Sequence, residues 1–192
     1  SSMPELEALD LCGAVTLDQF GYVRGPITDR ELTAVSLADF SNVTSLNLSY
    51  SEIRTTAPIV AHMPNLTSLD LSYTCCLTKL ESISCLGMLG GLRELNLAHA
   101  ELPTRTGSFL SFFNYSPKRS YVAEDEDDES RPESRLQSLS TSLTYLNLVG
   151  VRHPKDQHAA LEDAQLYPLM HLKSLRELHL GHSSVLGSDN MS

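Results

Sequence analysis

A short leucine pattern that recurs along the chain constrains its fold more than any other feature. The pattern is a leucine, two residues, a leucine, one residue and a third leucine, as in the stretch PNLTSLDL. Six copies occur, and they begin at Leu6, Val43, Leu66, Leu92, Leu143 and Leu175. Because the copies contain 17 of the 33 leucines, the leucine excess of the chain is largely this repeat.

The spacing of these leucines predicts extended structure. The last two leucines of each copy are separated by one residue, so they point to the same side of a strand. A strand this short cannot bury that side alone, whereas copies stacked side by side bury their leucines against each other. The pattern therefore predicts six short strands that share one apolar core.

Successive copies begin 37, 23, 26, 51 and 32 residues apart. The short intervals match the period of about 20 to 29 residues that is typical of leucine-rich repeats. The sequence therefore resembles the leucine-rich repeat family over nearly its whole length. The resemblance implies an α/β fold, a horseshoe-shaped solenoid with short parallel strands on its concave face and helices or turns on its convex face.

The segments between copies indicate helices of different lengths. Thr28 and Glu31 have the spacing of a helix-capping box before an apolar run. The segment TTAPIVAHM contains Pro58 and has room for one or two helical turns. The segment DQHAALEDAQLYPLMHL suggests a helix that ends near Pro168. The lengths of these connecting segments favour the ribonuclease-inhibitor-like subclass or the cysteine-containing subclass found in F-box proteins.

One position departs from the commonest pattern of the family. In that pattern an asparagine or cysteine often stands three places after the third leucine and bonds to the backbone. Here the position holds Ala14, Ser51, Thr74, Ala100, Val151 and Ser183. Serine and threonine can supply a weaker bond, but alanine and valine cannot, so the subclass stays open.

The intervals divide the chain into three parts. Residues 1–114 contain repeats 1–4, residues 115–142 form an acidic insert and residues 143–192 contain repeats 5–6. The insert includes six consecutive acidic residues at 124–129, and such like-charged runs repel themselves and stay disordered. It is either a tolerated surface insertion or a regulatory docking segment. No capping element stands at either end, so we expect a fragment of a longer solenoid.

Charge and composition exclude several classes of protein. The formal net charge is −10, which argues against nucleic acid and anionic membranes as partners. No apolar run is long enough to span a bilayer, and no signal peptide is visible, so we expect an intracellular, cytoplasmic protein. The four cysteines, Cys12, Cys75, Cys76 and Cys85, fit buried free thiols better than a disulfide framework or a metal site.

The sequence contains no motif for catalysis. Nucleophile elbows, phosphate-binding glycine loops, zinc-protease motifs and dinucleotide fingerprints are all missing. His179 and His182 lie close together, but no third metal ligand stands nearby. We therefore expect a protein that is not an enzyme and has no catalytic residue, no cofactor and no metal ion.

Residues between and beside the repeat leucines point to the concave face and form rows across the strands. The row between the last two leucines consists of Asp10, Asn47, Asp70, Asn96, Asn147 and His179. Tyr145 belongs to the row before it, and Tyr50, Tyr73 and His99 belong to the row just beyond the strands. Aromatic residues with a polar tip are common anchors of protein interfaces. These residues are the candidate protein-binding site.

The most consistent function is a non-catalytic protein–protein interaction module that binds a protein partner, with a preference for a basic one. One alternative is the substrate-receptor part of a ubiquitin ligase, by resemblance to F-box proteins with such repeats. A second is a structural subunit of a larger assembly, and a third is the regulatory repeat domain of an enzyme. The sequence leaves the oligomeric state open.

Overall fold

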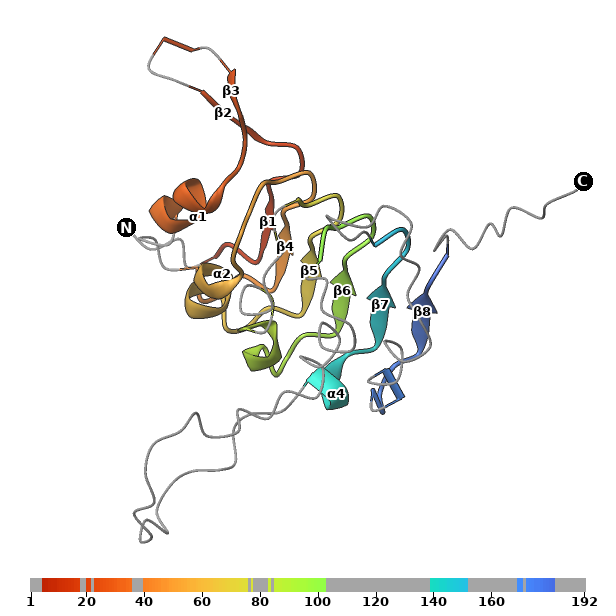
Figure 1. Ribbon diagram of the computed structural model, residues 1–192. Coiled ribbons are helices and arrows are strands. Elements are labelled where there is room, and N and C mark those ends of the chain that lie inside the picture. Colours follow the sequence, from red (N-terminus) through yellow and green to blue (C-terminus); the bar gives the residue numbers. More distant parts are fainter. Residues whose placement is uncertain are drawn as a thin grey trace, which may run out of the picture.

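The six leucine copies form one parallel sheet. The structure is a computed structural model that describes residues 5–17, 20–21, 23–35, 40–75, 77, 83, 85–102, 139–151, 169–170 and 172–181. The strands are β1 (Ala8–Asp10), β4 (Ser45–Asn47), β5 (Ser68–Asp70), β6 (Glu94–Asn96), β7 (Tyr145–Asn147) and β8 (Glu177–His179). They lie side by side in chain order and all pair in parallel (Figure 1). The chain is thus an α/β protein built on a six-stranded parallel sheet.

The register of the sheet follows the leucine pattern without a slip. The central leucines pair from strand to strand, in the order Leu9, Leu46, Leu69, Leu95, Leu146 and Leu178. A slip by one residue would turn every leucine towards water, so burial of one side fixes this register. Each residue of a copy therefore has its counterpart in the neighbouring copies at the strand spacing of about 4.8 Å.

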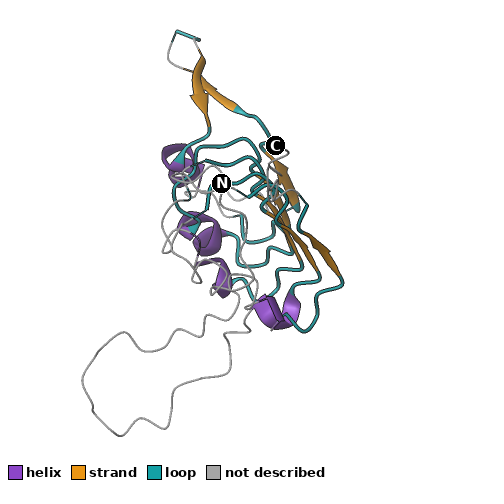
Figure 2. Cartoon of the chain, turned by 45° about the vertical axis from the view of Figure 1, so that its right-hand side comes forward, coloured by secondary structure: helices purple, strands orange, loops and turns teal. Residues whose placement is uncertain are grey.

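The core lies between the sheet and the helices. The side chains of Leu46, Leu69, Leu95 and Leu146 expose at most 1% of their surface. They belong to one cluster with residues of the returning segments, including Leu32, Ile59, Leu86 and Leu139. Figure 2 shows the sheet on one side of the molecule and helices on the other. Twelve of the 26 buried residues in this cluster come from the leucine copies, and the connecting segments supply the others. Burial of each leucine contributes about 1.5–3 kcal/mol.

The first helix begins where the sequence predicts a cap. Helix α1 covers Asp29–Val35, and Thr28 and Glu31 form the predicted capping box. The backbone N–H of Thr28 donates to the Glu31 carboxylate at 3.1 Å, and the Thr28 hydroxyl accepts from the N–H of Arg30 at 3.3 Å. The Thr28 hydroxyl also donates to Glu31 and lowers the pKa of Glu31 below its usual 4.5. This contribution to stability is present while Glu31 is charged and is lost as the pH falls through that lowered pKa.

The other helices are short. Helix α2 (Ala57–His62) begins with Pro58 in its first turn, which confirms the prediction of one or two turns for this segment. A 3-10 helix, η1, covers Cys85–Met88, and helix α4 covers Leu139–Ser142. Leu139 is completely buried, so the last residues of the predicted insert belong to the folded part. The remainder of that insert, and the helix predicted before Pro168, lie outside the described residues.

A hairpin that the leucine pattern did not predict follows the first strand. Strands β2 (Val15–Leu17) and β3 (Val23–Pro26) pair in antiparallel fashion, with an irregular register between Thr16 and Leu17. The hairpin projects beyond the sheet in Figure 1. It accounts for the long first interval, because the chain completes this hairpin before it enters α1.

The cysteines differ in part from the expectation of buried thiols. Cys12 is exposed, Cys75 and Cys85 are half-buried, and all three are free. Cys12 lies in the exposed turn directly after β1, because the first copy has a neighbouring strand on one side only. Cys76 lies outside the described residues.

Candidate functional site

The polar face of the sheet is the side to which the repeat leucines do not point. It is defined by the first and third residues of the six strands, and none of these is lysine or arginine: Ala8, Asp10, Ser45, Asn47, Ser68, Asp70, Glu94, Asn96, Tyr145, Asn147, Glu177 and His179. All of them are half-buried or exposed. The register places the members of each predicted row on adjacent strands. The face is therefore acidic and accessible.

The row between the leucines has a structural task that the sequence analysis did not recognise. Each Asp or Asn in it uses its side-chain oxygen to accept a bond from the backbone N–H two residues later. The five bonds are 2.8–3.1 Å long and start from Cys12, Ser49, Ser72, Ala98 and Val149. Such Asx turns redirect the chain at the end of a strand. These residues therefore shape the turns, and their free bonding capacity for a ligand is reduced.

Asp70 and Asn96 are also bonded to each other. The amide nitrogen of Asn96 donates to the second carboxylate oxygen of Asp70 at 2.9 Å. Both oxygens of Asp70 and both polar atoms of Asn96 thus have partners within the sheet. Glu94 and Glu177 are exposed, and each also has a partner on this face. Glu94 accepts from the Ser68 hydroxyl at 2.9 Å, and Glu177 bonds to His179 at 2.7 Å.

Each turn contains one residue in the left-handed backbone region. In successive copies this residue is Gly13, Tyr50, Tyr73, His99 and Gly150, with φ between 57° and 62°. Its N–H donates to a carbonyl of the next copy at 2.7–3.1 Å, so the strand-to-strand bonding continues through the turns. Left-handed backbone costs a residue with a side chain about 1–2 kcal/mol, and glycine avoids this cost. The tyrosines and the histidine therefore occupy positions where glycine would be less strained.

The three side chains at these turns stack on one another and form what we call the aromatic ladder, Tyr50, Tyr73 and His99. The Tyr50 and Tyr73 rings are 4.5 Å apart and parallel within 3°. The rings of Tyr73 and His99 are 4.6 Å apart and inclined by 18°. The spacing follows from the sheet, because equivalent residues on neighbouring strands lie about 4.8 Å apart. Tyr50 and Tyr73 remain 53% and 46% exposed.

Glycine stands at both ends of the ladder, but the two ends differ. A side chain at Gly150 would overlap the imidazole of His99, so this glycine provides room for the ring. A Cβ at Gly13 would meet nothing within 4 Å. The ladder is thus closed at His99 and open beside Tyr50.

The hydroxyl of Tyr50, at the open end of the ladder, stays protonated at neutral pH. Partial desolvation raises the pKa of Tyr50 above 10.0, and repulsion from Tyr73 acts in the same direction. Tyr50 therefore presents a neutral ring face with a hydroxyl group at its edge. Such a surface attracts a cation to the ring face and offers hydrogen bonds at the rim.

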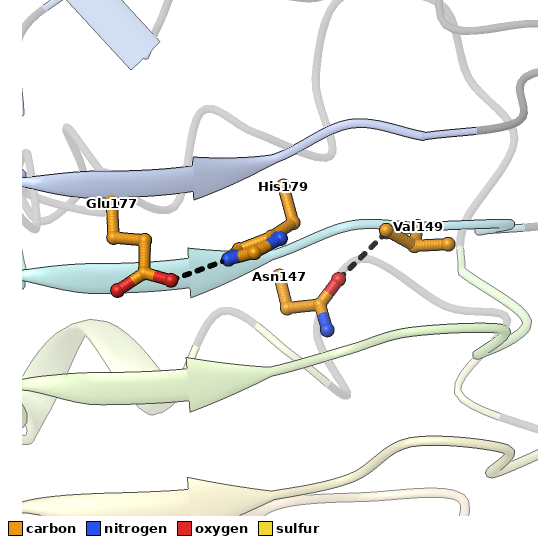
Figure 3. Close-up of polar contacts among 4 residues, drawn as sticks. All are labelled: Asn147, Val149, Glu177 and His179. Carbon is orange, nitrogen blue, oxygen red and sulfur yellow. Dashed lines mark hydrogen bonds and ion pairs between the residues drawn. The ribbon is translucent and has the colours of Figure 1, made fainter.

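The last two strands carry a different arrangement, shown in Figure 3. His179 replaces the Asp or Asn of the earlier copies and bonds to Glu177 through Nε2 at 2.7 Å. On the neighbouring strand, Asn147 still accepts from the N–H of Val149 at 3.0 Å. Tyr145 lies against His179 with ring centres 5.4 Å apart. His179 and Tyr145 therefore form a second, smaller aromatic pair on the polar face.

The position three places after the third leucine agrees only in part with the bonding expected of serine and threonine. The Thr74 hydroxyl, which is buried, donates to the carbonyl of Leu71 at 2.7 Å. The hydroxyl of Ser51 is buried but has no hydrogen-bond partner. The backbone bond expected of this position is thus made by threonine in one copy and missing in the copy before it.

The described residues contain neither a cluster of metal-ligating side chains nor a membrane-spanning helix. Within them, no three His, Cys, Asp or Glu side chains gather as a metal site would require. None of the helices that the structure describes is long and apolar enough to cross a bilayer. His182, the second histidine considered as a ligand, lies outside the described residues.

The sequence analysis placed Tyr50, Tyr73 and His99 in one row beyond the strands but did not predict that their rings stack. Their sequence positions could have indicated the stacking, because Tyr50, Tyr73 and His99 each follow a third leucine by two places. Comparisons with known proteins do not assign the chain to a family. No family model matches the chain, and no curated protein matches it.

Proposed function

We propose that this chain is a leucine-rich repeat solenoid of the non-catalytic, protein-binding kind. Its binding surface comprises the polar face of the sheet and the aromatic ladder beside it. The in-register pairing of the six leucine copies supports the repeat assignment. A repeated strand presents one extended surface, which suits the recognition of a protein partner.

The observation that carries this proposal is the exposure of strained aromatic residues. Tyr50 and Tyr73 have positive φ and expose about half of their surface. Each stacked pair contributes about 0.5–1.5 kcal/mol, whereas each left-handed residue costs about 1–2 kcal/mol. Glycine at Gly13 and Gly150 fills the same position without this cost. The rings are thus poorly explained by stability alone, and strained backbone of this kind is common at functional sites.

The charge of the surface favours a basic partner. Asp10, Asp70, Glu94 and Glu177 lie on the polar face, and no lysine or arginine shares its strand positions. Opposite charge on the partner speeds its association and disfavours acidic competitors. The partner therefore presents basic side chains to the sheet.

Arginine is the side chain that best fits the open end of the ladder. Its planar guanidinium stacks on aromatic faces and is weakly hydrated, unlike the ammonium group of lysine. A guanidinium lying over Gly13 continues the stack on the free face of Tyr50, where a Cβ on that glycine would meet no other atom within 4 Å. The carboxylate of Asp10, on the same copy, is exposed.

The decisive experiment replaces both ladder tyrosines with glycine. The Tyr50→Gly/Tyr73→Gly variant relieves the backbone strain as it removes the rings, so its melting temperature should stay close to that of the wild type. We expect it to lose at least tenfold in affinity for a fluorescein-labelled oligoarginine peptide, which corresponds to about 1.4 kcal/mol. An oligolysine peptide should bind more weakly than oligoarginine to the wild type.

The matched control is Met88→Ala, which removes an exposed apolar side chain from η1, 60% exposed and outside the ladder. Affinity capture from cell extract with wild type, control and ladder variant then identifies the partner. Proteins held by the first two baits and lost by the third are candidates for direct binding measurements. Equal capture by all three baits, together with equal peptide affinity, would refute the placement of the binding surface on the ladder.

A further inference from the structure

An open groove crosses the opposite ends of the strands. It has a volume of about 880 Å³ and is lined by residues that precede β5, β6, β7 and β8. Thr67, Arg93, Thr144 and Arg176 stand directly before the four strands and form successive rungs of its wall. We call it the basic groove, because Arg93, Lys173 and Arg176 line it.

The groove concentrates positive charge in an acidic chain. The described side chains include five lysines and arginines, and three of these line the groove. No aspartate or glutamate is among the described residues of its lining. Arg93, Lys173 and Arg176 are exposed, and within the described part of the chain their side chains make no hydrogen bond or ion pair. Three like charges gathered without counter-charge mark an attractive site for an anion.

Three hydroxyl groups of the groove already donate to backbone carbonyls, and a fourth, that of Ser142, is buried without a partner. Thr67 donates its hydroxyl to the carbonyl of Thr44 at 3.0 Å, and Thr144 donates to the carbonyl of Arg93 at 3.1 Å. Ser174 donates to the carbonyl of Thr141 at 2.6 Å. The positive charges are therefore the main donors for a ligand, and ligand charge rather than neutral hydrogen bonding decides binding.

The shape of the groove selects an extended ligand with several charges. Four rungs at the strand spacing span about 14 Å, which matches about four residues of extended peptide. Arg93 and Arg176 lie two strands apart, at about 10 Å between backbones. A single small anion cannot fill such a length, whereas carboxylates along a peptide can meet the charges in turn. No aromatic residue is among the described lining, so a nucleotide base would find no stacking partner.

We propose that the basic groove binds an acidic, carboxylate-rich peptide segment of a partner protein. This surface is separate from the ladder, because it lies before the strands and the ladder lies after them. Arg93 and Arg176 bind carboxylates through their planar guanidinium groups, which form paired hydrogen bonds with them. Lys173 adds a third charge beside Arg176.

The test uses the full chain and a fluorescein-labelled oligoglutamate peptide, with oligoglutamine of equal length as the neutral probe. Fluorescence anisotropy should detect oligoglutamate binding that weakens as the salt concentration rises, because these charges are exposed and screened. The Arg93→Gln/Arg176→Gln variant should lose at least tenfold in affinity. The matched control, Arg30→Gln/Arg54→Gln, changes the net charge equally at two exposed arginines outside the groove lining and should bind as the wild type does.

Three outcomes overturn the proposal. The first is equal loss of affinity in the groove variant and its control, which would mean that binding depends only on the net charge of the chain. The second is equal affinity for oligoglutamate and oligoglutamine. The third is oligoglutamate binding that occurs only after residues 124–129 are neutralised, which would assign the groove to the chain's own acidic run. The Tyr50→Gly/Tyr73→Gly variant should bind oligoglutamate normally, so the groove and the ladder can succeed or fail independently.

Discussion

The central strands of the sheet and its outer strands carry the same leucine pattern but differ in how well they are packed. The middle leucine exposes at most 1% of its surface in β4, β5, β6 and β7, but Leu178 in β8 exposes 39%. Leu9 in β1 is only partly buried. A repeat buries its leucines through neighbours on both sides, so equal sequence gives unequal stability along the sheet. Position in the stack, as well as residue type, therefore determines what a substitution does.

The largest effect should come from shortening equivalent leucines in the two regions. Leu95→Ala empties a site in β6 that is fully enclosed and should lower the free energy of unfolding by about 2–5 kcal/mol. Leu178→Ala, at the same position of β8, should lower it by less than about 1 kcal/mol because water already contacts that side chain. Urea unfolding followed by far-ultraviolet circular dichroism measures both values. Equal losses would mean that the strands at the centre and the edge are packed alike.

A smaller contrast is expected at the two glycines that flank the ladder. Gly13→Ala and Gly150→Ala both force a side chain into positive φ, which should lower the free energy of unfolding by about 1–2 kcal/mol. Gly150→Ala also drives a Cβ into the imidazole of His99 and should lose about a further 1–3 kcal/mol. Thermal unfolding compares the two variants directly. A Gly13→Ala variant as unstable as Gly150→Ala would contradict the open end of the ladder.

The smallest contrast concerns the Asx turns, which the first five copies have and the last described copy lacks. Asp70→Ala removes the acceptor for the N–H of Ser72 and should destabilise the chain by about 0.5–1.5 kcal/mol. Asp70→Asn keeps the acceptor for Ser72 and loses only the oxygen that accepts from Asn96, so it should cost less than Asp70→Ala. His179→Asn restores the usual residue in β8 and should change stability by only a few tenths of a kcal/mol, since His179 gives up its contact with Glu177. Chemical unfolding resolves the Asp70 pair, and a large loss in His179→Asn would contradict the structural role of this row.

Much of the fold could be predicted from the sequence because the spacing of the leucines indicates which side of each strand is buried. All six copies form strands, and the cap at Thr28 and Glu31 begins α1 as predicted. Those features depend on residues close together in the chain or on a repeated apolar period. The hairpin of β2 and β3 does not, since Val15, Leu17 and Phe20 are apolar yet remain exposed. A prediction that assigns apolar side chains to the core therefore misses this hairpin.

The candidate sites were harder to predict because they depend on residues from different copies. The shared row of Tyr50, Tyr73 and His99 could be predicted from their equivalent positions, but the left-handed backbone at these residues could not, because aromatic residues rarely adopt it. The Asp and Asn row was predicted as a binding row, and its local turn-forming bonds were missed. The basic groove joins Arg93 to Arg176, and only the parallel register brings such distant positions together.

The parallel rings of Tyr50 and Tyr73 also give the chain an optical signature. The chain has seven tyrosines and no tryptophan, so its near-ultraviolet spectrum comes from tyrosine without tryptophan bands above it. Two phenol rings at 4.5 Å and nearly parallel are close enough for their electronic transitions to couple. Circular dichroism near the tyrosine absorption band therefore contains a contribution from the coupled rings of the ladder. A ligand that stacks on Tyr50 changes that band without any label on the protein.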